Sequence, residues 1–240
     1  HGGGYAIGTI RGYLSLASHL AKATGCSVLV IDYGLAPEDK FPVAINDTKT
    51  AFKWMLENGP NGNTRCDKSF ISGDSAGGGL AIGATLALKD DNFDLPNAVI
   101  PLSPWAELDP VSEFYEINKK LDPYISKDAI SAFKDLYIKN ESDIKHPYAS
   151  PVHGDFDGFP PMLIQVGSRE VLLGDSKKIA EKAKESGCNI SLEIWDDMVH
   201  VFHGYAPFLP EANEALEAIG SFISDKWKNL SIKKSYMVLL

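Results

Sequence analysis

The sequence predicts an α/β fold, with a mostly parallel sheet covered by helices on both faces. Short apolar runs alternate along the chain with longer segments whose apolar residues recur at helical spacing. Several runs are apolar at nearly every position, as in strands that are buried on both sides. With 240 residues, 44% of them hydrophobic, the chain can bury a large core, so we expect a single domain over residues 1–240.

The predicted elements follow one another in strand–helix order. The expected strands are 27–33, 69–73, 98–103, 162–166 and 190–195. The expected helices are 8–24, 43–58, 76–88, 126–138, 175–186 and 210–228. Gly25 provides a stop for the first helix, and Ser126 has the hydroxyl of a helix N-cap. A short basic run follows the last helix, so we expect residues 229–240 to be an exposed tail.

The stretch Gly73-Asp74-Ser75-Ala76-Gly77 has the pattern G-x-S-x-G, typical of a tight turn between a strand and a helix. Glycines on both sides allow the strand and the helix to approach closely. The turn places the serine at a helix N-terminus, where free N–H groups favour developing negative charge. Ser75 is therefore a candidate nucleophile.

A glycine run, His1-Gly2-Gly3-Gly4, stands at the start of the chain, upstream of this turn. In lipases and esterases, backbone N–H groups of such a run complete an oxyanion hole together with the residue after the nucleophile. We therefore expect Gly3, Gly4 and Ala76 to be the donors. A flexible terminus alone would not explain why the run precedes a nucleophile turn.

With these two motifs the chain resembles the hormone-sensitive-lipase-like esterases of the α/β-hydrolase fold. The other matching stretches, in the family's order, are 32–38, 103–105, 160–168 and 198–202. The likeness runs from His1 to about Trp227. It implies a carboxylic ester hydrolase that works through an acyl-enzyme on short- to medium-chain esters, with no cofactor and no metal.

The resemblance also implies that the N-terminal cap and the first strands of the family's eight-stranded sheet are missing. The family's third strand lies between the strands equivalent to 27–33 and 69–73. Its loss would leave two rows of backbone groups unpaired, at about 1–3 kcal/mol for each buried group. We therefore expect five strands with a gap, and a chain that is insoluble or inactive when expressed alone.

A serine nucleophile needs a base, and a third group that orients the base. In the resembling family the chain order is serine, acid, histidine, which leaves His200 and His203 as bases. His200 is expected, because the family's histidine is followed one residue later by Phe, here Phe202. For the acid, the family's position falls on Glu170, whereas Asp175 is the alternative and would otherwise serve as a helix N-cap.

Two further expectations concern the surroundings of these groups. The guanidinium of Arg169 is adjacent to Glu170 in sequence and is expected to pair with its carboxylate. Tyr5, Trp105 and Tyr115 are expected to line the substrate pocket.

Other functions use the same motifs. A lactone hydrolase and an amide deacetylase share this machinery. A small-molecule receptor of the same fold, like the plant gibberellin receptors, lacks the catalytic histidine, so the presence of His200 favours an enzyme.

Composition excludes several classes of partner. A net charge of −9 argues against a nucleic-acid surface. No apolar stretch is long enough to span a membrane. The 3 cysteines are too few and too scattered for a disulfide framework or a metal cluster, which favours a cytoplasmic protein with reduced thiols. A small-molecule ester is the expected partner, and a homodimer is left open.

Overall fold

Six parallel strands form one sheet in the structure, a computed structural model that describes residues 1–59, 62–226 and 235–239. The strands lie in the order β1-β6-β2-β3-β4-β5. Their bounds are β1 (Ser27–Val30), β2 (Lys68–Asp74), β3 (Ala98–Leu102), β4 (Met162–Gly167), β5 (Ile190–Trp195) and β6 (Ser235–Leu239). Every neighbouring pair is parallel, so the predicted fold class is confirmed.

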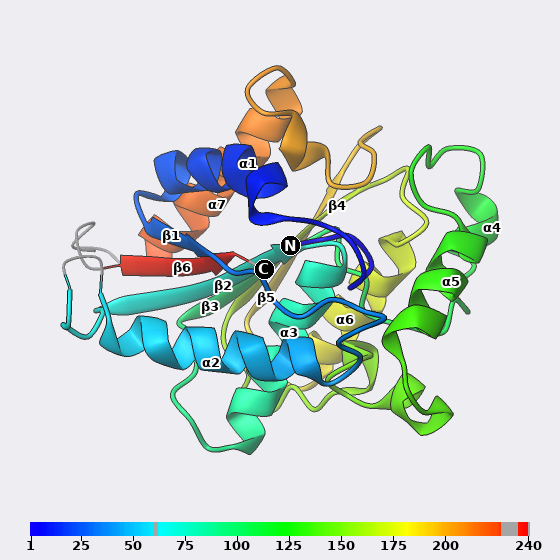
Figure 1. The fold of residues 1–240 in the computed structure, drawn as a ribbon. Helices are drawn as coiled ribbons and strands as arrows, with labels where there is room; N and C mark the ends of the chain where they lie inside the picture. The colour runs from blue at the N-terminus through cyan, green and yellow to red at the C-terminus, as the bar shows by residue number, and fades with distance from the viewer. Residues whose placement is uncertain (60–61, 227–234, 240) are drawn as a thin grey trace.

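Helices cover both faces of this sheet (Figure 1). The α-helices are α1 (Ile10–Thr24), α2 (Val43–Glu57), α3 (Ala76–Asp90), α4 (Phe114–Ile117), α5 (Lys127–Tyr137), α6 (Leu173–Glu185) and α7 (Pro210–Lys226). Short 3-10 turns are η1 (Glu141–Lys145), η2 (Pro151–His153) and η3 (Phe202–Tyr205). In Figure 1, α1 and α7 lie on one side of the sheet, and α2, α3 and α6 lie on the other.

The core is divided by the sheet into two apolar layers. Successive side chains of a strand point to opposite faces, so Phe70 packs with the α1–α7 layer and Ile71 with the α2–α3–α6 layer. Ile100 and Val99 alternate in the same way on β3. Burial on both faces explains why these strands read as continuous apolar runs in the sequence.

Capping and stop residues in the sequence predicted most helix boundaries. Ser126 caps α5 as expected, because its Oγ accepts a hydrogen bond of 3.2 Å from the N–H of Ala129. β1 ends at Val30, shorter than the expected 27–33, and its residues are half-buried because it lies at the edge of the described sheet. α6 begins at Leu173, two residues earlier than expected, so Asp175 is not its N-cap.

The prediction of an exposed tail over residues 229–240 was wrong for its last part. Residues 235–239 form β6, while 229–234 and 240 lie outside the described residues. β6 pairs with β1 on one side and with β2 on the other, where the sequence had predicted a gap. The unpaired rows, on which the expected insolubility rested, are therefore filled by the chain's own C-terminal strand.

Among the helices of the described residues, none combines the length and the apolar character needed to cross a membrane.

Candidate active site

Ser75 lies in the sharp turn between β2 and α3, as its motif predicts. Its φ of 53° is in the left-handed region, which costs a non-glycine residue free energy and is held here by surrounding contacts. The N–H of Ser75 donates to the carbonyl of Leu102 at 2.9 Å, and the Ser75 carbonyl accepts from the N–H of Trp105 at 2.9 Å. The serine is thus tied to the end of β3 on both sides.

His200 and Glu170 form a close pair beside this turn. The Nδ1 of His200 lies 2.7 Å from the Oε2 of Glu170, whose side chain is fully buried. The other carboxylate oxygen, Oε1, accepts from the Ser103 hydroxyl at 2.7 Å and from the Gly167 N–H at 2.6 Å. A carboxylate held by three donors keeps its orientation, and it fixes the imidazole with Nε2 available for proton transfer.

The charge of Glu170 also sets the basicity of His200. Burial by itself lowers the pKa of this histidine, but the hydrogen bond and the negative charge of Glu170, together with the charges of Asp122 and Asp74, outweigh burial. The net pKa of His200 is therefore raised above its ordinary value of 6.5. A raised pKa makes the imidazole a stronger general base.

Two residues that the sequence did not suggest as functional hold the acid and the base in place. Besides binding Glu170, the Ser103 hydroxyl accepts from the Val201 N–H at 3.2 Å, so it connects the acid to the loop that carries His200. Asn118 donates from Nδ2 to the carbonyl of Glu170 at 2.7 Å. Ser103 lies in the stretch 103–105, one of those that resemble the esterase family. Asn118 directly follows α4 and no sequence motif surrounds it.

The alternative base has a different environment. His203 is fully buried, and its Nε2 lies 3.0 Å from the Oε1 of Gln165. Burial and the nearby His200 lower the pKa of His203 to about 3, so the ring stays neutral. It is absent from the residues that line the cavity beside Ser75.

The alternative acid also faces elsewhere. One oxygen of Asp175 accepts from the backbone N–H groups of Ala106 and Glu107, both at 2.9 Å. It therefore braces the segment after β3. The expected pairing of Arg169 with Glu170 was wrong, because the Arg169 guanidinium pairs with Asp197 at 3.0 Å on the surface.

The glycine run lies beside Ser75 in a backbone conformation that requires glycine. Gly3 and Gly4 have φ values of 110° and 61°. A Cβ on Gly4 would lie 2.4 Å from the ring of Phe133, and one on Gly3 would lie 2.0 Å from the Ile7 carbonyl oxygen. Both glycines line the same cavity as Ser75 and His200, and Ala76 is the first residue of α3.

Asp74 anchors the glycine run. Its Oδ1 accepts from the Gly2 N–H at 3.1 Å, and its Oδ2 accepts from the Tyr13 hydroxyl at 3.3 Å. Burial raises the pKa of Asp74 to about 6, although Gly2, the two nearby histidines and Tyr13 favour the ionised form. The residue before the nucleophile therefore connects the nucleophile turn to the glycine run.

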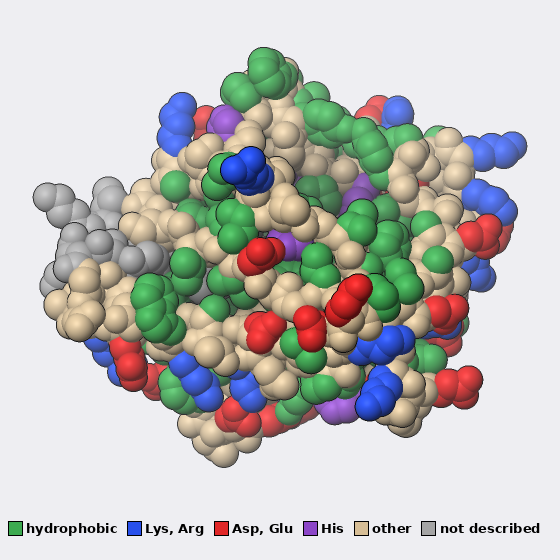
Figure 2. Space-filling view, viewed as in Figure 1, with side chains coloured by type: hydrophobic (Ala, Val, Ile, Leu, Met, Phe, Trp, Pro, Cys, Tyr) green, Lys and Arg blue, Asp and Glu red, His purple; other side chains and the backbone are tan. Residues whose placement is uncertain are grey.

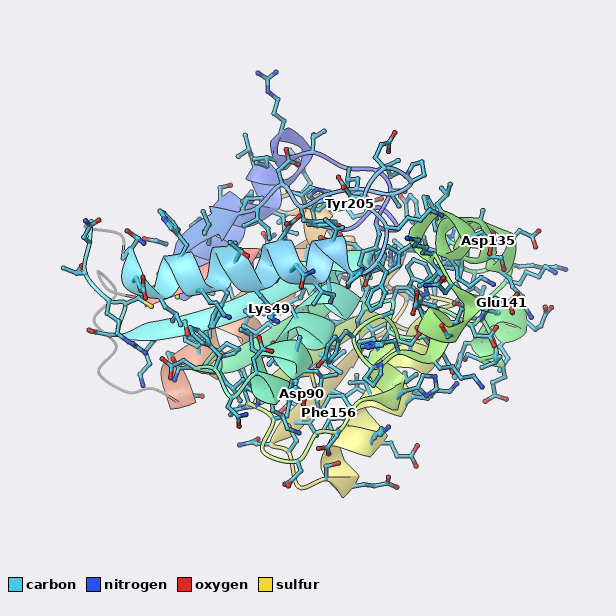
Figure 3. The ribbon with its side chains drawn as sticks, turned by 60° about the horizontal axis from the view of Figure 1, so that its bottom comes forward. Lys49, Asp90, Asp135, Glu141, Phe156 and Tyr205 are labelled. Carbon is cyan, nitrogen blue, oxygen red and sulfur yellow. The ribbon has the colours of Figure 1, made fainter. Side chains whose placement is uncertain are left out.

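A cavity of about 670 Å³ opens beside these groups. Its wall includes the apolar side chains Ile7, Leu16, Ile125, Ile130 and Phe133. Figure 2 shows hydrophobic side chains gathered around a hollow between α1, η3 and α5. Tyr205, which Figure 3 shows between α1 and the α5 region, lies at this cavity and its hydroxyl contacts that of Tyr124.

Of the three aromatic residues expected in the pocket, Trp105 alone lines it. Tyr5 is fully buried and stacks on Tyr137 with ring centres 3.9 Å apart. Tyr115 is buried near Asp175. Both tyrosines therefore belong to the core. Tyr5, directly after the glycine run, and Tyr115, on α4, each direct their side chains into the protein interior. The aliphatic wall was missed, although Ile130 and Phe133 recur at helical spacing on α5.

A family profile described as the alpha/beta hydrolase fold matches residues 1–204. The chain belongs to this family. An acetyl-hydrolase of Streptomyces hygroscopicus is 39% identical over 224 residues, which are 93% of this chain and 73% of that protein. An esterase of Acinetobacter venetianus is 34% identical, over 92% of this chain and 72% of that protein.

Solved structures agree with these relatives. An esterase from the bacterial hormone-sensitive lipase family is 40% identical, with a TM-score of 0.88 over 94% of this chain and 74% of that one. The esterase EstE5, soaked with p-nitrophenyl butyrate, is 40% identical, with a TM-score of 0.88 over 95% of this chain and 75% of that one. The chain is a hormone-sensitive-lipase-like esterase, and an enzyme that hydrolyses carboxylic esters.

Proposed function

We propose that the enzyme hydrolyses short- to medium-chain carboxylic esters through a Ser75–His200–Glu170 triad and an acyl-enzyme. The observation that carries this proposal is the buried 2.7 Å pair between His200 and Glu170, at a cavity that Ser75 and the glycine run also line. These are the groups that acyl transfer requires: a nucleophile, an oriented base and donors for an oxyanion.

In the first half-reaction, the Nε2 of His200 takes the proton of the Ser75 hydroxyl while Oγ attacks the ester carbonyl carbon. The negative charge that develops on the carbonyl oxygen is stabilised by the N–H groups of Gly3, Gly4 and Ala76. The tetrahedral intermediate then collapses, and His200 returns the proton to the departing alcohol oxygen. Glu170 remains ionised and stabilises the imidazolium.

In the second half-reaction, a water molecule replaces the alcohol. His200 takes a proton from the water, whose oxygen attacks the acyl carbon bound to Ser75. Collapse of the second intermediate breaks the bond to Oγ and releases the carboxylic acid, and the proton returns to Ser75.

The cavity supports the choice of acyl group. Its aliphatic and aromatic wall suits an apolar acyl chain, and its volume of about 670 Å³ has room for a small ester. One relative is named an acetyl-hydrolase, and EstE5 was soaked with a butyrate ester. A lactone or an acetylated amine presents the same carbonyl to the same groups, so these substrates are compared directly in the test.

The test compares Ser75→Ala with the wild type on p-nitrophenyl acetate, butyrate and octanoate, an aliphatic lactone and an N-acetyl amine. We expect butyrate hydrolysis to be the preferred reaction, and Ser75→Ala to lower it by more than about a hundredfold. Ser18→Ala, which removes an exposed serine hydroxyl on α1, is the matched control. Residual activity of Ser75→Ala above a hundredth of wild type would contradict the assignment, as would faster turnover of the lactone or the amide.

A further inference from the structure

β6 occupies the one position in the sheet that is flanked by two strands from the first third of the chain. Its residue Leu239 is in register with Val30 of β1 and with Ser72 of β2. Backbone pairing therefore runs along both edges of β6, as it does for an interior strand. The segment comes from the far end of the sequence, after α7.

The start of the glycine run lies just beyond the C-terminal end of β6. Two residues beyond Val30 is Asp32, and its Oδ1 lies 4.0 Å from the Nε2 of His1. Two residues beyond Ser72 is Asp74, and its Oδ1 accepts from the Gly2 N–H at 3.1 Å. His1 and Gly2 thus lie between the same two strands as β6, just past its end, and Figure 1 shows the β6 arrow pointing toward the start of the chain.

Aromatic contacts fix this junction. The His1 ring stacks with both Tyr13 and Tyr33, at centroid distances of 5.1 and 4.7 Å. The Tyr33 hydroxyl donates to the His1 carbonyl. Tyr33 follows β1 and Tyr13 lies on α1, so the start of the glycine run is bound by the segment after β1 and by the helix that covers this face of the sheet.

We propose that β6 positions the oxyanion loop, and that residues 235–239 and His1–Gly4 act as one strand-and-loop unit whose two parts come from opposite ends of this sequence. The catalytic part of this inference rests on the proposed function, because it takes the N–H groups of Gly3 and Gly4 as oxyanion donors. Its structural part rests on strand register and on the contacts of His1 and Gly2.

Oxyanion donors stabilise a transition state only if they are already held in place. Gly3 and Gly4 have little steric restraint of their own, since glycine populates positive and negative φ with similar ease. A strand hydrogen-bonded on both edges holds β1 and β2 at a fixed separation, and His1 and Gly2 lie between the segments that follow these two strands. Loss of β6 pairing should therefore increase the mobility of the Gly3 and Gly4 N–H groups more than that of Ser75.

The decisive experiment joins Leu240 directly to His1 by head-to-tail ligation and keeps all 240 residues. If the two ends form one unit, the link fits without strain. We expect kcat/KM for p-nitrophenyl butyrate to stay within about threefold, and the melting temperature to rise by about 3 °C or more because the unfolded chain is restricted. Amide hydrogen exchange of residues 2–8 should slow about tenfold.

A pair of proline substitutions in the open chain forms the matched comparison. Val238→Pro removes a backbone donor from the interior of β6, whereas Ser235→Pro changes its first residue, where proline is tolerated. We expect Val238→Pro to lower kcat by about tenfold or more and to speed exchange of residues 2–8, with Ser235→Pro close to wild type. If Val238→Pro is insoluble, the joined chain carries the test alone.

A joined chain that is unfolded, or that melts below the open chain, would overturn the inference. Equal behaviour of the two proline variants would overturn it as well. Failure of the proposed function is distinguishable: a joined chain that gains stability and protection, in an enzyme whose Ser75→Ala variant still hydrolyses esters, supports the role of β6 and contradicts the triad.

Discussion

The Nδ1 of His200 and the Oε2 of Glu170 are 2.7 Å apart, and the second oxygen of Glu170 is held separately by Ser103 and Gly167. The carboxylate therefore cannot turn away from the imidazole without breaking two further hydrogen bonds. The expected effect of replacing Glu170 and the expected pH dependence of activity both follow from this fixed relationship.

Glu170→Gln should lower kcat on p-nitrophenyl butyrate by about a thousandfold or more, because a neutral amide neither stabilises the imidazolium nor selects its tautomer. Asp175→Asn, a change of the same kind at the alternative acid, should lower kcat less than about threefold, since Asp175 binds the backbone of Ala106 and Glu107. Steady-state kinetics of the two purified variants make the comparison. A larger loss in Asp175→Asn would reverse the assignment of the acid.

The pH dependence of kcat/KM should show an acid limb with its midpoint above 6.5, because Glu170 raises the pKa of His200 above that ordinary value. The base must be neutral, so activity falls as pH decreases through this pKa. Residual activity of Glu170→Gln should have its limb at lower pH, because the group that raises the pKa is gone. Rates measured from pH 5 to pH 9 test this, and a wild-type midpoint near pH 5 would contradict it.

Asp74→Ala should lower kcat by about tenfold to a hundredfold, since it leaves the buried Gly2 N–H without its acceptor. Asp74→Asn keeps an oxygen at that position and should lose much less. KM should change little in either variant if Asp74 positions the oxyanion loop and does not touch the substrate. A larger loss in the asparagine variant would indicate that the charge of Asp74 matters more than its hydrogen bond.

Phe133→Ala should raise the ratio of octanoate to butyrate hydrolysis, because the ring forms part of the cavity wall against Gly4. Removing it enlarges the apolar volume that a longer acyl chain can fill, which is worth about 0.8 kcal/mol for each additional buried methylene. The matched control is Phe208→Ala, whose ring is 91% exposed. An unchanged ratio in Phe133→Ala would place the acyl chain elsewhere in the cavity.

Asp175 should contribute a pH dependence to stability. Burial raises the pKa of Asp175 to about 7 in the folded protein, above the ordinary value of 3.8. The folded chain therefore holds this proton more tightly, and the stability it contributes at pH 4 is lost as pH rises to 7. Relative to Asp175→Asn, the wild-type free energy of unfolding should fall by about 1.4 kcal/mol per pH unit across this interval.

Urea unfolding of both proteins at several pH values measures the difference. Asp128→Asn, a change at an exposed carboxylate in the first turn of α5, is the control and should show no such trend. A wild type that gains stability relative to Asp175→Asn as pH rises from 4 to 7 would contradict the prediction.

Much of the site could be predicted from short stretches of sequence. Local sequence predicted the turn at Ser75, the glycine run and the helix cap at Ser126. Each of these features depends on backbone constraints within a few residues of its position. The strand–helix alternation likewise predicted the fold class, because strands buried on both faces read as continuous apolar runs. His200 and Glu170 required the resemblance to a family, since they are distant from Ser75 in the chain.

Long-range contacts decided the rest. Residues 235–239 are too few for their sequence pattern to distinguish a strand from an exposed tail. They form β6 because β1 and β2 both offer unpaired backbone groups at this position. Arg169 forms its ion pair with Asp197 and not with its neighbour Glu170, because the side chain of Glu170 is buried. Tyr5 is in the core while Phe133 lines the cavity, since the direction of each side chain depends on how the oxyanion loop and α5 pack, which only the tertiary structure determines.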